Sequence, residues 1–160
     1  MNSSVSVKKI IDDTKLKHVA IIMDGNRRWA RNLGLPSAAG HKKGVASLRE
    51  IVRACDDFGI KYITVYAFST ENWNRSKEEV DFLMDLVALT LKNELDEMDK
   101  EKVKISFIGD LSKLSDKLQS VVSNAQFKTQ NNQGVNLQIA LNYVGVFLIM
   151  EIIYITCLMI

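Results

Sequence analysis

The sequence predicts an α/β domain in which a twisted parallel sheet is flanked by helices. Four short runs of aliphatic and aromatic residues, at 19–23, 62–68, 103–108 and 135–141, alternate with longer segments whose apolar residues have helical spacing. Helices between successive strands imply parallel crossovers, which bring the carboxyl ends of all four strands to one edge of the sheet. Ligands of open α/β sheets bind at that edge, so the polar residues that follow each strand are candidates for a site.

The composition indicates one globular domain. The chain has 160 residues, of which 47% are hydrophobic and 25% charged, and its net charge is only +2. Over the whole chain basic and acidic residues are interspersed, so we expect no nucleic-acid partner. Cys55 and Cys157 lack metal-ligand spacing and no secretory leader precedes them, which favours a reducing, cytoplasmic setting with Cys55 in the core.

The first strand ends in a polar turn that suits a phosphate group. Gly25 permits a tight turn after Asp24, and Asn26 is expected to cap a helix whose first turn carries Arg27 and Arg28. Free backbone N–H groups and two guanidinium groups suit a diphosphate, while the adjacent carboxylate suits Mg²⁺. The alternative is an ordinary Asp-Gly turn followed by solvated arginines.

The segment after this turn is expected to hold a short helix over 26–33 and a loop over 34–40. A helix over 41–58 should follow, because its apolar residues recur at helical spacing and Gly59 ends it. His41 begins this helix, where an isolated histidine is more often a capping or surface residue than a ligand.

The second strand runs into a polar loop over 69–75, which has more functional groups than a connection requires. Ser76 and Glu79 form a capping-box pattern that opens a helix through about Met98, with an apolar stripe over 80–95. In the alternative interpretation the loop is simply solvated and Trp73 anchors it.

The third and fourth strands end at Gly109-Asp110 and Asn142-Tyr143, and a long helix is expected over 111–131 between them. All four polar strand ends should therefore be neighbours at one edge, in a lateral order that the pattern leaves open.

Four segments in this order, HVAIIMDGNRRWA, GHKKG, YAFSTENWNR and IALNY, resemble the cis-prenyltransferases of the undecaprenyl diphosphate synthase type. The resemblance covers residues 16–143. It implies a cytoplasmic, homodimeric, Mg²⁺-dependent enzyme. Such an enzyme condenses an allylic diphosphate, for example farnesyl diphosphate, with isopentenyl diphosphates to a cis-polyprenyl diphosphate. Transient association with a membrane surface for product release is also expected.

The resemblance also assigns roles to residues. Asp24 corresponds to the catalytic carboxylate that directs Mg²⁺ to a diphosphate, and the allylic diphosphate would be held by Gly25, Asn26, Arg27, Arg28, Trp29 and His41. The isopentenyl unit would be ordered by Ser69, Thr70, Glu71, Asn72, Trp73 and Arg75. Family descriptions name the asparagine as proton acceptor. Because a neutral amide is a poor base, we expect Asn72 to position substrate while a diphosphate oxygen or a water takes the proton. The 80–95 stripe would line a tunnel for the growing chain, although periodicity alone makes it core.

The chain departs from the family pattern in two places. Ser37 stands where an arginine is common, and after Tyr143 the family's Gly-Gly-Arg and its long C-terminal region give way to an apolar tail over 144–160. We expect a fold incomplete at this end, with an exposed sheet edge, marginal stability and little catalysis. The tail is interpreted as an out-of-frame reading, with a buried element or a membrane anchor as alternatives.

Residues 1–15 are expected to form an N-terminal extension that is loose over 1–6. The alternative function is a non-catalytic remnant or partner subunit of a complete prenyltransferase. A generic nucleotide-binding domain is disfavoured, since neither a G-x-x-x-x-G-K-[ST] loop nor a G-x-G-x-x-G turn is present.

Overall fold

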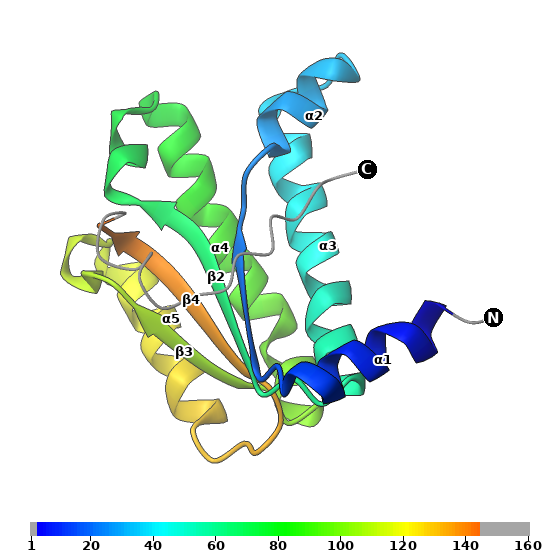
Figure 1. The fold of residues 1–160 in the computed structure, drawn as a ribbon. Coiled ribbons are helices and arrows are strands. Elements are labelled where there is room, and N and C mark those ends of the chain that lie inside the picture. Colours follow the sequence, from blue (N-terminus) through cyan, green and yellow to red (C-terminus); the bar gives the residue numbers. More distant parts are fainter. Residues whose placement is uncertain (1–2, 145–160) are drawn as a thin grey trace.

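The computed structural model describes residues 3–144 and confirms the predicted α/β fold with a parallel sheet. Four strands pair in parallel throughout, in the order β1-β2-β4-β3 (Figure 1). Their bounds are β1 (His18–Ile22), β2 (Tyr62–Ser69), β3 (Lys104–Ile108) and β4 (Asn136–Tyr143). The last strand therefore lies between β2 and β3. The residues expected to form the tail after Val144 lie outside the described residues.

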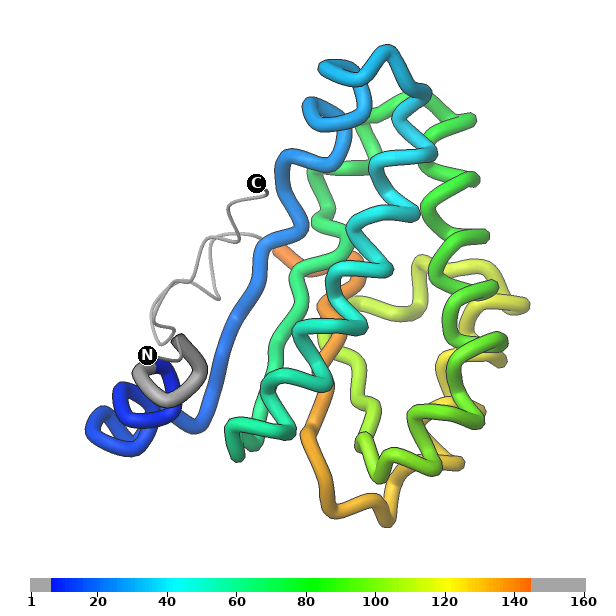
Figure 2. Tube along the Cα trace, turned by 90° about the vertical axis from the view of Figure 1, so that its right-hand side faces the viewer, coloured from blue at the N-terminus to red at the C-terminus, as the bar shows by residue number. Residues whose placement is uncertain are grey.

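Three long helices cover one face of this sheet (Figures 1 and 2). They are α3 (Ser37–Asp57), α4 (Lys77–Lys100) and α5 (Asp116–Thr129), and α4 packs between the other two. Their apolar stripes meet the strands in one core, to which α4 contributes Val80, Leu91 and Leu95. Cys55 is buried in this core as expected, and burial raises the pKa of its thiol to about 11. No helix within the described part of the chain has the length and apolarity needed to cross a membrane.

Two segments that the sequence predicted to be irregular are partly helical in the structure. The N-terminal segment, expected to be loose over 1–6, is helical from Ser3 onward as α1 (Ser3–Thr14), and Ile11 of α1 packs into the core. Helix α3 begins at Ser37 and not at His41, because Pro36 immediately precedes it with a φ of −60°. Proline at this position is already set for helix entry, so the loop shrinks to the turn between Leu33 and Pro36.

The prediction of a single helix over 111–131 is wrong. A short 3-10 turn, η2 (Leu111–Lys113), comes first, and the Asp110 carboxylate caps it by accepting from the Ser112 N–H at 3.1 Å. The chain then restarts as α5, where the Ser115 side chain accepts from the N–H of Leu118. The serine cap separates two segments whose apolar spacing looked continuous.

The short helix α2 (Asn26–Asn32) packs against α3 at two glycines. A Cβ atom built on Gly40 would lie 2.0 Å from the Asn26 carbonyl oxygen, and one on Gly44 would lie 2.7 Å from the Asn26 side-chain oxygen. Asn26 is therefore not the helix cap that its residue type suggested. Gly25, with a φ of 85°, occupies the cap position, while Asn26 is 6% exposed between the helices.

Replacing Gly40 with alanine should destabilise the fold by about 3 kcal/mol, because the added methyl group has no space against the α2 backbone. Thermal unfolding should show a fall in Tm on the order of 10 °C. Gly34→Ala is the matched control. Gly34 has open space around it but a φ of +67°, so that change should cost only about 1 kcal/mol. Equal losses for the two variants would contradict the steric account.

Candidate active site

Two adjoining cavities lie at the carboxyl edge of β1 and β2. The first has a volume of about 720 Å³ and a basic lining that includes Arg27, Arg28, Arg31 and Arg75. The second, of about 310 Å³, lies between the sheet and helices α3 and α4, and most of its lining is apolar. Residues that line both are Met23, Asp24, Asn26, His41 and Arg75. A basic chamber therefore opens beside an apolar one.

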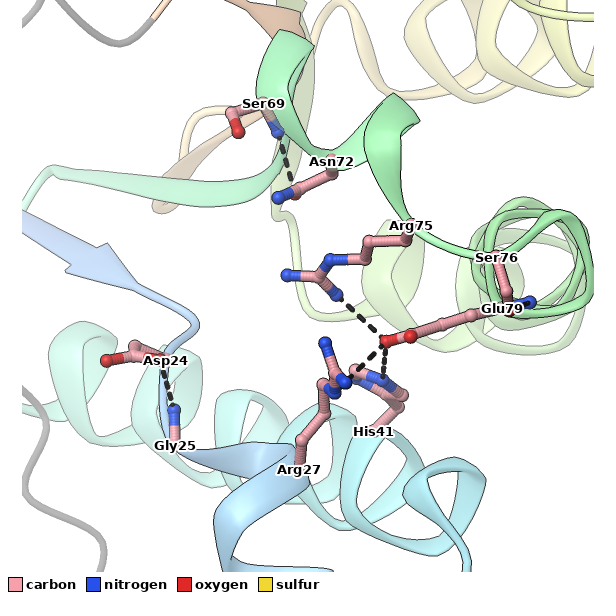
Figure 3. Close-up of polar contacts among 9 residues, drawn as sticks. All are labelled: Asp24, Gly25, Arg27, His41, Ser69, Asn72, Arg75, Ser76 and Glu79. Atoms are coloured by element: carbon pink, nitrogen blue, oxygen red, sulfur yellow. Dashed lines mark hydrogen bonds and ion pairs between the residues drawn. The ribbon is translucent and has the colours of Figure 1, made fainter.

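Asp24 stands where the two cavities meet. It follows β1, and its Oδ1 accepts from the N–H of Gly25 at 2.7 Å, while the side chain remains exposed (Figure 3). Within the described residues no group of three or more His, Cys, Asp or Glu side chains could hold a metal ion. Mg²⁺ often uses one or two protein carboxylates and completes its shell with phosphate oxygens and water. The single carboxylate of Asp24 therefore fits a metal shared with a diphosphate.

Glu79 connects two arginines and a histidine from different parts of the chain (Figure 3). Its Oε1 lies 3.1 Å from Arg75 Nη1, 3.6 Å from Arg27 Nε and 3.3 Å from His41 Nε2. All three partners line the basic cavity, whereas Glu79 lines neither cavity and is 16% exposed. The carboxylate lies behind the cationic wall, so it orients these side chains without occupying the space in front of them.

His41 is buried beside this carboxylate, and burial lowers the pKa of its imidazole below the ordinary value of 6.5. The hydrogen bond and charge of Glu79 act in the opposite direction and raise that pKa. Because burial is the larger effect, His41 is neutral at neutral pH, and its Nε2–H donates to Glu79.

The polar loop after β2 folds as a 3-10 turn, η1 (Thr70–Asn74). Asn72 Oδ1 accepts from the N–H of Ser69 at 3.0 Å, so this contact fixes which end of the amide carries the oxygen. Both Asn72 and Arg75 point toward the space in front of Asp24 (Figure 3). The β2 ladder is irregular between Tyr66 and Ser69, and such irregularity re-aims the residues that leave a strand.

Trp73 anchors the same loop to β4. Its Nε1–H donates to Asn142 Oδ1 at 2.8 Å, and its ring lies edge-on to Phe68 with centroids 5.0 Å apart. Asn142 in turn donates to the Asp110 carbonyl at 2.8 Å. The polar ends of β3 and β4 are thus neighbours of the loop. Asp110 and Asn142 brace it and line neither of the two cavities, whereas Tyr143 at the end of β4 lines the apolar cavity.

The structure divides the predicted site residues into two groups. Those that line one of the two cavities are Asp24, Gly25, Asn26, Arg27, Arg28, His41, Ser69, Asn72 and Arg75. Those that line neither are Trp29, Thr70, Glu71 and Trp73.

Sequence reasoning missed Glu79 as a site residue, because the pattern with Ser76 explained it as a helix cap. Half of that capping box forms, since Ser76 Oγ accepts from the Glu79 N–H at 3.3 Å, but the carboxylate turns to the cations. A glutamate four residues after Arg75, on a helix that begins at a polar strand end, was the available signal.

Comparison with known proteins places this arrangement in a family. The prenyltransferase family model for undecaprenyl diphosphate synthase matches residues 22–156. The isoprenyl transferase of Clostridium perfringens is 49% identical over 136 residues, which is 85% of this chain and 54% of that protein. An isoprenyl transferase of Prochlorococcus marinus is 50% identical over 136 residues, which is 84% of this chain and 51% of that protein.

Solved structures agree with the sequence matches. The lavandulyl diphosphate synthase of Lavandula x intermedia, in complex with dimethylallyl diphosphate, aligns with a TM-score of 0.76 at 39% identity. It covers 79% of this chain and 55% of the lavender chain. The probable undecaprenyl diphosphate synthase of Campylobacter jejuni aligns with a TM-score of 0.66 at 32% identity, covering 80% of this chain and 55% of that chain. The chain spans about half the length of these relatives, and it belongs to the isoprenyl transferase family that includes undecaprenyl diphosphate synthase.

Proposed function

We propose that this chain carries the diphosphate-binding and prenyl-binding portion of a Mg²⁺-dependent cis-prenyltransferase. Its substrates would be an allylic diphosphate and isopentenyl diphosphate. The observation that carries the proposal is the junction of the basic cavity with the apolar cavity at Asp24, His41 and Arg75. An allylic diphosphate has the same two parts, a charged head and an apolar chain joined at the reacting carbon.

The basic cavity supplies the charge that a diphosphate requires. Its lining includes Arg27, Arg28, Arg31 and Arg75. A guanidinium group can donate two parallel hydrogen bonds to the oxygens of one phosphate. The departing diphosphate gains negative charge as the allylic bond breaks, so cations held in place before the reaction stabilise that charge.

The apolar cavity supplies a water-poor space for the prenyl chain. Val65 and Leu137 form its sheet side, and Leu83 and Val87 form part of the α4 side. The apolar stripe of α4 therefore lines a cavity in addition to packing into the core, which supports the tunnel assignment. Exclusion of water also protects an allylic cation from hydrolysis.

Asp24 would hold Mg²⁺ together with diphosphate oxygens, and the bound ion would help to neutralise the diphosphate. Asn72 has a different task in this proposal. Its oxygen already accepts a hydrogen bond from Ser69, which leaves the amide N–H groups free to donate toward an isopentenyl diphosphate. This supports a positioning role for Asn72, with a diphosphate oxygen or a water taking the proton.

Calorimetric titration with farnesyl thiodiphosphate tests the proposed function. With Mg²⁺ present, the intact amphiphile should bind more tightly than inorganic pyrophosphate or farnesol alone, since it fills both cavities. If the amphiphile binds no more tightly than pyrophosphate, the apolar cavity does not receive the chain and the proposal fails. Incorporation of labelled isopentenyl diphosphate then separates a catalytic chain from a non-catalytic partner subunit.

Asp24→Asn should abolish the gain in pyrophosphate affinity that Mg²⁺ provides, because the amide has lost the charge that a hard cation requires. We expect Mg²⁺ to strengthen pyrophosphate binding about tenfold in the wild type and not in the variant, measured at the same free Mg²⁺. Asp110→Asn is the matched control, since Asp110 is an exposed carboxylate at the same sheet edge that caps its own turn. A Mg²⁺ effect that survives in Asp24→Asn would remove Asp24 from the metal site.

Glu79→Gln should lower the pKa of His41 further, because the variant loses the negative charge that now opposes the effect of burial. NMR titration of the imidazole measures this directly. The chain has two histidines, so His18 serves as the internal reference and should not change. Glu78→Gln is the control, since Glu78 is exposed and forms no ion pair with the other described residues. An unchanged His41 pKa in Glu79→Gln would show that the two groups are not paired in solution.

A further inference from the structure

The phenyl and phenol rings that line the apolar cavity gather at its polar end. They belong to Tyr66, Phe68 and Tyr143. Tyr66 and Phe68 lie within three residues of Ser69, the carboxyl end of β2, and Tyr143 pairs with Ser69 across the sheet. Among the described α4 residues that line the same cavity, none is aromatic. Aliphatic side chains suffice to hold a hydrocarbon chain, so the position of the rings indicates a separate task beside the diphosphate.

Tyr66 and Tyr143 form an aromatic pair near Asp24. Their ring centroids are 5.0 Å apart, the ring planes are tilted by 53°, and both residues are partly buried. The backbone carbonyl of Tyr66 accepts from the Met23 N–H at 3.4 Å, and Asp24 follows Met23 directly. Because Asp24 stands where the two cavities meet, the pair lies close to the point where an allylic diphosphate joins its chain.

A negative charge lies near the Tyr143 ring. Burial raises the pKa of the Tyr143 phenol, and Tyr66 and the negative charge of Glu71 raise it further. The phenol is therefore neutral at neutral pH. Glu71 forms no ion pair with the other residues of the described range 3–144, so its charge is not compensated there. A carboxylate next to an aromatic face makes that face more attractive to a cation.

We infer that Tyr66 and Tyr143 stabilise the positive charge that develops on the allylic group as its diphosphate leaves. This inference rests on the proposed function. When the bond between C1 and the diphosphate oxygen breaks, its electron pair leaves with the diphosphate, and the positive charge spreads over C1 and C3. The π electrons of isopentenyl diphosphate then form the new bond to C1, and loss of a proton removes the remaining charge.

The arginines of the basic cavity cannot perform this task. They stabilise the departing diphosphate, but like charges repel, so they disfavour a cation on the carbon that it leaves. The face of an aromatic ring attracts a cation, and the attraction is strongest where water is excluded. The tyrosine pair therefore complements the arginines, since each group stabilises one of the two charges that separate in the reaction.

Calorimetric titration of the full chain with two unreactive ligands tests this inference. Citronellyl diphosphate has the geranyl skeleton with a saturated C2–C3 bond, so it forms no allylic cation. Its 3-aza analogue carries a protonated amine at C3, where the allylic cation bears part of its charge. The ratio of the two affinities measures the preference for a cation at matched shape.

This affinity ratio should fall about fivefold in Tyr143→Leu and in Tyr66→Leu, because each variant removes one aromatic face. Binding of citronellyl diphosphate should remain at the wild-type level, which shows that the cavity is intact. Tyr143→Phe keeps the ring and should keep the ratio. Tyr62→Leu is the matched control, since Tyr62 is a 45% exposed tyrosine of the same strand as Tyr66 and lines neither cavity.

An unchanged ratio in both Tyr66→Leu and Tyr143→Leu would overturn the inference, and so would an equal fall in Tyr62→Leu. Weaker binding of both ligands in Tyr143→Phe would also overturn it, because the hydroxyl group would then be the part that binds substrate. A separate outcome concerns the wild type. If citronellyl diphosphate binds it no more tightly than pyrophosphate, the proposed function fails and the inference fails with it. Tight binding with an unchanged ratio in the variants rejects the aromatic role alone.

Discussion

The close approach of α2 to α3 is the contact on which the rest of the site depends. Gly40 and Gly44 are one helical turn apart, and both face Asn26, which is buried between the helices. This contact fixes the first residue of α2, and Arg27 and Arg28 follow it directly. His41 lies next to Gly40 on the same turn of α3. Because Gly40 and Gly44 have no side chains, the two helices can approach this closely, and that approach determines where the arginines of α2 lie relative to Asp24.

The charge of Glu79 connects side chains from segments that helix packing alone does not hold together. Arg27 belongs to α2, His41 to α3 and Arg75 to the segment after η1, and the Glu79 carboxylate contacts all three. Because Glu79 contributes one negative charge against several cations, the cavity in front remains positive. An anion that enters meets side chains that are already oriented, so less conformational entropy is lost on binding.

The sequence predicts the strands well because a buried parallel strand needs a continuous apolar run, and each run here ends at a polar residue. It could not give the lateral order, since β4 inserts between β2 and β3 through contacts distant in sequence. Predictions from local sequence patterns were wrong or incomplete where contacts between distant elements determine the position of a side chain. Asn26 has a capping side chain but is buried against glycines, and Glu79 has capping-box spacing but its carboxylate contacts Arg27 and Arg75. Trp73 was assigned to substrate by resemblance, while its indole is hydrogen-bonded to Asn142.

The hydrogen bonds around the cavity bear on where a proton can go in the proposed reaction. Asn72 Oδ1 is engaged by Ser69, and His41 Nε2 donates to Glu79. The arginines can only donate. In this tautomer the Nδ1 of His41 carries a lone pair and can accept a hydrogen bond. Among the described residues that line the two cavities, the one carboxylate is that of Asp24, and the proposed metal role would occupy it. Under the proposed function, the arginines and the Asn72 amide N–H groups therefore present donors to the substrates, and a diphosphate oxygen held by those donors is the proton acceptor that we propose.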